Sequence, residues 1–345
     1  MKYFTRIFLS LCFLLLVACS APPASPPSSA DTASLGSGDA ARTLASLRQV
    51  DKYPLYSMTY YGSYDAVHTK IARAAIDAQS HPWGCSLFAA LGDTKHMVFG
   101  RNFDWDFSPA VLIFTHPSGG YASVSMVDIT YLGYNNQDVA SLTSSGKRTL
   151  LLHAPLIPFD GMNEYGLTVG MAAVPGSPGP APDPARQTVG SLRIIRLMLD
   201  HAKTVSEAIA VIRQYNVDFA GGPPLHYLLA DPSGQAATVE WKDGSLQVIG
   251  NPVPWQVTTN FYLVGASEQM KTQDRRYRTA ATWLQAADGR MGPAEAMLLL
   301  ERIEQTITQW SIVYDMTTGD IRLVMAEAYN HVYTYHLPVQ EGRGA

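Results

Sequence analysis

The sequence predicts an α+β fold in which antiparallel sheet is covered by helices, and two observations lead to this prediction. Two pairs of apolar, strand-like runs are each joined by a short turn, 226–230 with 237–241 and 310–316 with 321–325. Two helical patterns lie between these hairpins, at 275–286 and 293–305, and the second has proline at its first position. Hairpins with helices grouped between them indicate antiparallel sheet packed against helices.

The remaining elements follow from the same patterns. Apolar runs predict strands at 97–99, 111–114, 150–152 and 167–171, and an alternating pattern predicts a last strand at 331–337. One-face apolar spacing predicts a helix over 194–201. Thr204 and Glu207 form a capping box that predicts the start of the next helix, which runs to about residue 212.

Composition and charge narrow the class of protein. The chain has 345 residues, of which 47% are hydrophobic and 16% charged, as in one large or two ordinary globular domains. The net charge is −4 and there is no basic stripe, which argues against a nucleic-acid partner. The nine histidines are dispersed without metal-ligand spacing, so we expect neither a metal nor another cofactor.

The first 18 residues have the pattern of an export signal. Lys2 and Arg6 precede an apolar stretch over 7–18, which is short for a membrane span. The stretch ends in Leu-Val-Ala followed by Cys19, which resembles a bacterial lipobox. This resemblance implies cleavage before Cys19, lipid attachment to its sulfur, and a protein anchored in the bacterial cell envelope, exposed to the periplasm or exterior. An ordinary secretory signal is the alternative.

The composition changes twice after the signal. Residues 19–44 are rich in Pro, Ser and Ala and predict a flexible tether. Residues 45–84 are different, because they contain an aromatic strand-like run at 53–61 and a helical pattern at 68–79. A folded segment is therefore expected before residue 85.

Cys85 is the one cysteine that lies outside the signal and lipobox. The chain has three cysteines, and the other two are Cys12 and Cys19. A lone thiol is either a small buried hydrophobe or a reactive group. Cys85 follows Pro-Trp-Gly, begins an apolar run, and is trailed by a polar cluster at 101–104, which favours the reactive group.

Five blocks of sequence together resemble the N-terminal-nucleophile amidases of the choloylglycine hydrolase, acid ceramidase and N-acylethanolamine acid amidase group. The blocks are Gly84-Cys85-Ser86-Leu87, Gly100-Arg101-Asn102-Phe103-Asp104-Trp105, the run 160–167, Thr258-Thr259-Asn260-Phe261 and Asp274-Arg275-Arg276. The resemblance implies a four-layer αββα sandwich of two antiparallel sheets between helix layers. It also implies that the mature chain begins with the nucleophilic cysteine. Residues 45–84 would then be a pro-segment separated by self-cleavage at Gly84–Cys85 from the catalytic domain, 85–345. The sequence leaves open whether the cleaved segment stays bound.

The resemblance also assigns roles to site residues. Cys85 would attack a linear amide through its thiol, and its own α-amino group, with a pKa near 8, would accept and return the proton. Arg101 and Asp104 would hold this amine and thiol in place. Asn260 would donate its amide N–H to the oxyanion.

The resemblance implies two further site residues, each of which matches only one part of the amidase group. Asn163, in the block at 160–167, would help Asn260 at the oxyanion, although it also fits a turn between strands. Arg275 would complete the polar network, with Arg276 and Arg278 as competing choices.

The expected activity is hydrolysis of an N-acyl compound, with acyl transfer at the same site as an alternative. The expected substrates are N-acylethanolamines or ceramide-like lipids, N-acyl amino acids or homoserine lactones, bile-salt conjugates, or penicillin V-type amides. A Ser-x-x-Lys acyltransferase is weaker, because Ser144 and Lys147 lie in a turn-like stretch and no Lys-Thr-Gly follows. A further alternative is a non-enzymatic solute-binding or adhesion lipoprotein, but this function would not explain the pattern of residues around Cys85. The sequence leaves open whether the chain forms a homo-oligomer.

Overall fold

The computed structural model describes residues 36–69, 84–140, 142, 146–174, 176, 179–220 and 222–340. The predicted signal, Cys19, most of the predicted tether and the predicted helix at 68–79 from residue 70 on lie outside this part. Among the described residues, no helix has the length and apolar character needed to cross a bilayer.

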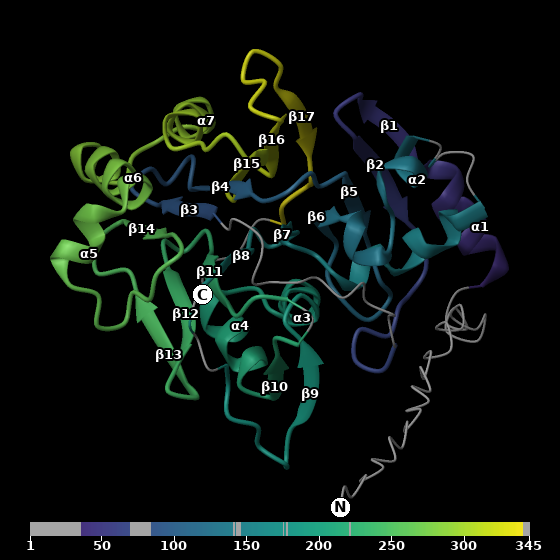
Figure 1. Ribbon diagram of the computed structural model, residues 1–345, viewed down its shortest axis with the longest axis horizontal. Helices are drawn as coiled ribbons and strands as arrows, with labels where there is room; N and C mark the ends of the chain where they lie inside the picture. Colours follow the sequence, from purple (N-terminus) through teal and green to yellow (C-terminus); the bar gives the residue numbers. More distant parts are fainter. Residues whose placement is uncertain are drawn as a thin grey trace, which may run out of the picture.

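Two large sheets form the centre of the molecule (Figure 1). The first has nine strands in the order β1 (Arg48–Asp51), β2 (Leu55–Tyr60), β5 (Ala110–Thr115), β6 (Ser123–Asp128), β7 (Asp160–Asn163), β8 (Thr168–Ala173), β11 (Leu225–Ala230), β12 (Ala236–Lys242) and β13 (Ser245–Gly250). The second has six, in the order β14 (Trp255–Thr258), β3 (Gly84–Ala90), β4 (Val98–Asp104), β15 (Thr308–Asp315), β16 (Asp320–Met325) and β17 (Tyr333–His336). Neighbouring strands in both are antiparallel, except β2 and β5, which are parallel.

Helices cover the outer face of each sheet. On the nine-stranded sheet, α3 (Arg193–His201) contacts β7 and β8, and α4 (Val205–Ile212) contacts β11 and β12. On the six-stranded sheet, α6 (Arg275–Ala286) contacts β14 and β3, and α7 (Pro293–Arg302) contacts β4 and β15. The two sheets meet where β3 contacts β8 and β11. The predicted four-layer αββα arrangement is confirmed.

The shorter elements lie around these layers. They are the helices α1 (Ser37–Ser46), α2 (Asn136–Ala140) and α5 (Glu268–Gln273), the 3-10 helices η2 (Ile129–Leu132) and η3 (Gly146–Leu156), and a parallel pair of strands, β9 (Gln187–Gly190) with β10 (Tyr215–Asp218).

Two apolar cores follow from the alternation of side chains along the strands. In β3, Cys85 and Leu87 belong to the core between the sheets, whereas Phe88 and Ala90 belong to the core beneath α6 and α7. Both faces of β3 are buried, as expected for a central strand covered on each side.

Two sequence-based expectations need correction. The run at 150–152 was predicted as a strand, but it lies in η3, because a short buried apolar run does not distinguish strand from helix. Helix α1 begins at Ser37, inside the stretch predicted as tether, and Thr43 within it is fully buried. The folded part of the chain therefore starts before residue 45.

Candidate active site

The antiparallel pairing of β3 with β4 brings Cys85 and Arg101 together. The register places Cys85 opposite Phe103 and Leu87 opposite Arg101. Facing residues on paired strands share a face, so the side chains of Cys85, Phe103 and Arg101 point into the space between the sheets. Arg101 Nη2 lies 3.9 Å from Cys85 Sγ. Sixteen positions separate Cys85 from Arg101 in the sequence, and the hairpin formed by β3 and β4 brings the two side chains back together.

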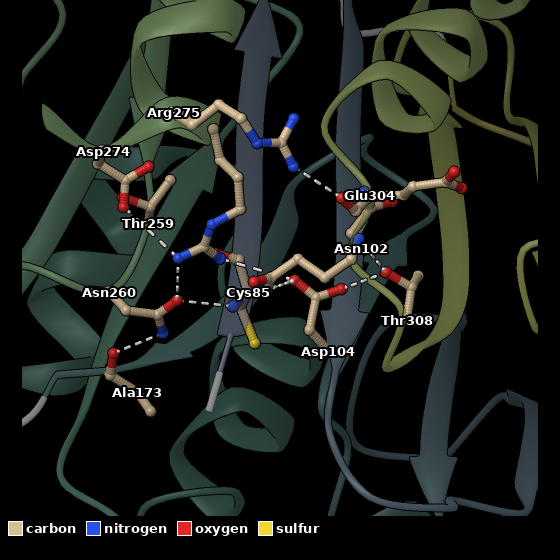
Figure 2. Close-up of polar contacts among 12 residues, drawn as sticks. Cys85, Asn102, Asp104, Ala173, Thr259, Asn260, Asp274, Arg275, Glu304 and Thr308 are labelled. Carbon is tan, nitrogen blue, oxygen red and sulfur yellow. Dashed lines mark hydrogen bonds and ion pairs between the residues drawn. The ribbon is translucent and has the colours of Figure 1, made fainter. Parts of the chain in front are cut away.

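The backbone of Cys85 is held by two side chains from another part of the chain (Figure 2). Its nitrogen donates to Asn260 Oδ1 at 2.7 Å, and its carbonyl oxygen accepts from Arg276 Nη1 at 2.8 Å. Arg276 Nη2 donates to the same Asn260 oxygen at 3.0 Å. Asn260 Nδ2 donates to the carbonyl of Ala173 at 2.8 Å. These bonds fix both the nitrogen and the carbonyl of Cys85.

Arg276, and not Arg275, belongs to this network, which corrects the prediction. Asp274 caps α6 through a bond from the nitrogen of Tyr277 at 2.8 Å, so Arg275 and Arg276 are the first two residues of the helix. Successive helical residues point about 100° apart. Arg275 donates instead to the carbonyl oxygen of Glu304 at 2.9 Å, away from Cys85 (Figure 2). The third choice, Arg278, donates to the carbonyl of Thr272.

Asp104 lies on the opposite face of β4 from Arg101, towards the helices. Its carboxylate accepts from Gln305 Nε2 at 2.6 Å and from the Thr308 hydroxyl at 2.5 Å, and Arg276 Nη1 is 3.6 Å away. Burial raises the pKa of Asp104, and these donors oppose that rise. Gly84 faces Asp104 in the register, so the predicted cleavage junction lies directly beside this carboxylate.

A buried ion pair orients Arg101. Its Nη1 lies 2.6 Å from Asp160 Oδ2, and neither side chain has any exposed surface. Asp160 also accepts from the Tyr314 hydroxyl at 2.5 Å and from Trp310 Nε1 at 3.2 Å. Burial raises the pKa of Asp160 and Arg101 opposes this, while burial and Asp160 raise the pKa of Tyr314. The pair leaves Nη2 of Arg101 directed at the thiol.

Asn163 is not brought to Cys85. It stands three residues after Asp160 on β7, and residues three apart on a strand point to opposite faces. Its Nδ2 donates to the carbonyls of Leu199 at 3.0 Å and Ala202 at 2.7 Å, at the end of α3. The prediction that Asn163 helps Asn260 at the oxyanion is therefore wrong. Within the block at 160–167 it is Asp160 that lies at the site, where it pairs with Arg101. The alternation of side chains along a strand could have identified Asp160 from the sequence.

His226 and Glu240 brace the loop that carries Asn260. Nε2 of His226 donates to the carbonyl of Thr259 at 2.6 Å, and its Nδ1 is 3.3 Å from Glu240. Glu240 accepts from the backbone nitrogens of Leu263 at 3.1 Å and Val264 at 2.6 Å. Burial would raise the pKa of Glu240, but these hydrogen bonds lower it overall. The sequence suggested no role for this pair.

The thiol of Cys85 faces an apolar pocket of about 480 Å³, including the part open to solvent. Its walls are mostly aromatic and aliphatic side chains, among them Phe103, Trp105, Tyr131, Phe159, Met171 and Leu225. Burial raises the pKa of the Cys85 thiol despite the charge of Arg101. A thiol with a raised pKa is protonated at neutral pH, so a nucleophilic role of Cys85 would require a base.

Residues 85–262 match the family described as linear amide C-N hydrolases, choloylglycine hydrolase family. A structure of penicillin V acylase from Agrobacterium tumefaciens is similar, with a TM-score of 0.52, 20% identity, and coverage of 76% of this chain and 90% of that chain. A mutant of conjugated bile acid hydrolase from Clostridium perfringens is similar with a TM-score of 0.54, 16% identity, and coverage of 73% and 92%. The family match begins at Cys85 and includes Arg101, Asp104, Asp160 and Asn260.

Proposed function

Since the chain belongs to the choloylglycine hydrolase family of linear amide C–N hydrolases, we propose that it hydrolyses an N-acyl amide with Cys85 as an N-terminal nucleophile. The observation that carries this proposal is the placement of the two atoms of Cys85 that such a mechanism needs. The thiol faces the apolar pocket, and the nitrogen is held by Asn260. The family match that begins at Cys85 supports the same reading.

The first step frees the nitrogen of Cys85. The thiol adds to the carbonyl carbon of Gly84, the Gly84–Cys85 amide bond breaks, and the proton of the thiol passes to the nitrogen, which becomes a primary amine. Water then hydrolyses the Gly84 thioester, which gives a carboxylic acid on Gly84 and restores the thiol. Asp104 pairs with Gly84 in the strand register, and Arg276, 3.6 Å from the Asp104 carboxylate, donates to the Cys85 carbonyl and holds it in place.

The freed residue then supplies both nucleophile and base. Its α-amine, with an ordinary pKa of about 7.7–8.0, accepts the proton of the thiol. Without this base the thiol would stay protonated, because burial raises its pKa. The thiolate attacks the substrate carbonyl, and the same amine gives the proton to the departing nitrogen. Water adds to the thioester and releases the acid. Arg101 stabilises the thiolate from 3.9 Å. The side-chain amide of Asn260 has two N–H groups. One donates to the carbonyl of Ala173, and the other donates to the oxyanion of the substrate.

The pocket suggests the kind of substrate. Its aromatic and aliphatic walls suit an apolar acyl group next to the scissile amide. N-acylethanolamines and ceramide-like lipids, N-acyl amino acids, acyl homoserine lactones, bile-salt conjugates and penicillin V-type amides all have this form. We further propose that the enzyme works outside the cytoplasm, anchored through lipid on Cys19 in the cell envelope, because its first 19 residues have the lipoprotein pattern.

Intact-mass measurement of the purified protein tests the proposal. We expect one polypeptide that begins at Cys85 and a separate one that ends at Gly84. Cys85→Ala should stay a single chain and hydrolyse none of these N-acyl amides. An active wild-type protein that remains uncut would refute the N-terminal nucleophile, and a folded, cut protein inactive on all of these amides would refute the substrate class.

A further inference from the structure

The position of Asn260 depends on the loop that follows β14. Asn260 accepts from the Cys85 nitrogen at 2.7 Å and donates to the Ala173 carbonyl at 2.8 Å (Figure 2). It lies beyond the strand pairing of β14, which ends at Thr258 opposite Leu87. The direction of its side chain is therefore set by whatever holds the backbone on either side of it.

Two buried side chains hold this backbone, one before Asn260 and one after it. His226 Nε2 lies 2.6 Å from the carbonyl oxygen of Thr259, the residue before Asn260. Glu240 accepts from the backbone nitrogen of Val264 at 2.6 Å and from that of the residue before it at 3.1 Å. Both side chains are fully buried and come from β11 and β12, neighbouring strands of the nine-stranded sheet. The loop is therefore fastened to that sheet on both sides of Asn260.

The ring of His226 faces a hydrogen-bond acceptor at each nitrogen. Nε2 faces the Thr259 carbonyl oxygen, and Nδ1 lies 3.3 Å from Glu240 Oε2. A neutral imidazole has one N–H, so it can serve only one of these oxygens and turns a lone pair towards the other. A doubly protonated ring donates to both. Burial would raise the pKa of Glu240, but its hydrogen bonds, that from His226 first, lower it overall. A charged carboxylate therefore stands ready to pair with a charged ring.

Two charged side chains of α6 also reach the loop, but they hold different atoms. Asp274 accepts from the Thr259 hydroxyl at 3.3 Å. Arg276 Nη2 donates to Asn260 Oδ1 at 3.0 Å. Both contacts are made to side-chain atoms. His226 holds the backbone carbonyl that directly precedes Asn260, which these two contacts do not.

Resting on the function proposed above, we propose that His226 and Glu240 form a buried imidazolium–carboxylate pair that positions Asn260 for the reaction. In the proposed mechanism the oxygen of the Asn260 amide holds the Cys85 nitrogen, and one N–H of the same amide donates to the oxyanion. Both contacts require one orientation of the side chain. A looser loop would misdirect the donor, and the loss would be greatest in the transition state, where the charge on the oxyanion develops. His226 and Glu240 are positioning residues, because they act through the loop.

Nitrogen NMR of the Cys85→Ala protein tests the charged pair without any catalysis. Isotope-labelled histidine reports the protonation of each ring nitrogen, and the signal that disappears in His226→Gln identifies His226. We expect both ring nitrogens of His226 to carry a proton at neutral pH. A ring protonated at Nε2 alone would overturn the charged pair.

Two matched substitutions test the positioning role. His226→Gln and His96→Gln each remove a histidine that contacts a carboxylate, but His96 lies 2.7 Å from Asp315, at the far end of β4 from the residues that face Cys85. In cut protein, with the cut fraction measured by mass, we expect His226→Gln to lower kcat about tenfold or more and to change KM less than about threefold. His96→Gln should change both less than about twofold. Equal effects of the two variants would overturn the positioning role.

Substitutions of Glu240 give a second test that does not depend on the folding of His226→Gln. Glu240→Gln keeps an acceptor oxygen for Val264 and can donate to Nδ1 of a neutral His226 ring, whereas Glu240→Leu can do neither. We expect Glu240→Leu to lower kcat about tenfold or more and Glu240→Gln to recover most of this loss. Folded, cut Glu240→Leu with unchanged kcat would overturn the positioning role. A folded, cut wild-type protein inactive on all N-acyl amides would refute the proposed function instead, and the NMR result would still decide the charge of the pair.

Discussion

The backbone nitrogen of Cys85 donates a hydrogen bond to Oδ1 of Asn260 at 2.7 Å, and this nitrogen is the atom that cleavage would convert from amide to amine. An amide nitrogen has no basic lone pair, whereas an α-amine can accept a proton near neutral pH. The acceptor that holds the nitrogen in the uncut chain is equally suited to hold an ammonium group. In the cleavage proposed above, the contacts of this nitrogen would therefore be in place before it became an amine.

The first prediction separates the two arginines at the start of α6. Arg276 contacts both the Cys85 carbonyl and Asn260, so Arg276→Leu should lower kcat/KM on the order of 100-fold through misplacement of the reacting residue. Arg275→Leu removes bonds to exposed carbonyls of Arg302 and Glu304, so its stability should change by less than about 0.5 kcal/mol and its activity little. Steady-state kinetics on cut protein, with the cut fraction measured by mass, decide this. A larger loss in Arg275→Leu would reverse the assignment.

The second prediction concerns the cleavage junction. A Cβ on Gly84 would lie 1.9 Å from Nε2 of Gln305, which donates to Asp104. Gly84→Ala must displace Gln305 from Asp104, so we expect slower cleavage, followed over time by mass. Once cut, the catalytic chain is unchanged in sequence, so activity per cut molecule should equal that of the wild type.

Adding Gln305→Ala gives the control for this explanation. Removal of the Gln305 side chain makes room for the new methyl group, so cleavage in the double variant should be faster than the product of the two single effects predicts. Strictly multiplicative rates would show that Gly84 and Gln305 do not interact and that the packing argument is wrong.

The third prediction distinguishes a structural Asn163 from one at the oxyanion. Asn163→Ala removes two hydrogen bonds to the end of α3 and should lower the free energy of unfolding by about 1–3 kcal/mol. Activity per folded molecule should stay near that of the wild type. Loss of an oxyanion donor costs about 10²–10³ in kcat, so a loss of that size in folded protein would restore the sequence-based role.

The fourth prediction is a pH dependence of stability that comes from Asp128. Burial raises the pKa of this carboxyl from 3.8 to about 6. Its Oδ1 caps Thr130, its Oδ2 has no hydrogen-bond partner among the described residues, and the nearby Ser108 hydroxyl donates to a backbone carbonyl instead. The folded state thus holds this proton more tightly than the unfolded state does. Its contribution to stability is complete below about pH 4 and is lost as the pH rises through about 6.

Asp128→Asn has no proton to lose and keeps the oxygen that caps Thr130. Two pKa units correspond to about 3 kcal/mol, so the variant should be more stable near pH 7 by up to about that amount, and close to the reference near pH 4. Denaturant unfolding in the Cys85→Ala background, where the chain is expected to stay single, gives the comparison. A constant difference across this pH range would exclude the titration of Asp128 as the cause.

The sequence correctly predicted those residues near Cys85 whose positions depend on a single hairpin, β3 with β4. Arg101 and Asp104 follow Cys85 at distances fixed by the pairing of β3 with β4, so their place is a local property. It could not separate Arg275 from Arg276, because both stand at the start of one helix and the direction of each depends on how α6 packs on the sheet. The sequence could not identify Gln305, Thr308 or His226 as residues near the site. Their hydrogen-bond partners are distant in the chain, and no motif or regular spacing connects these residues with Cys85.

The parallel pairing of β2 with β5 has a consequence for how the enzyme would be held at a membrane. If lipid is attached at Cys19 and the chain is cut before Cys85, the lipid and the catalytic residues belong to different polypeptides. The catalytic chain would then be tethered by a strand of sheet and by buried side chains, not by a covalent link. High salt should leave it with the membrane fraction, whereas a chaotrope that unfolds the sheet should release it and leave the lipidated polypeptide behind.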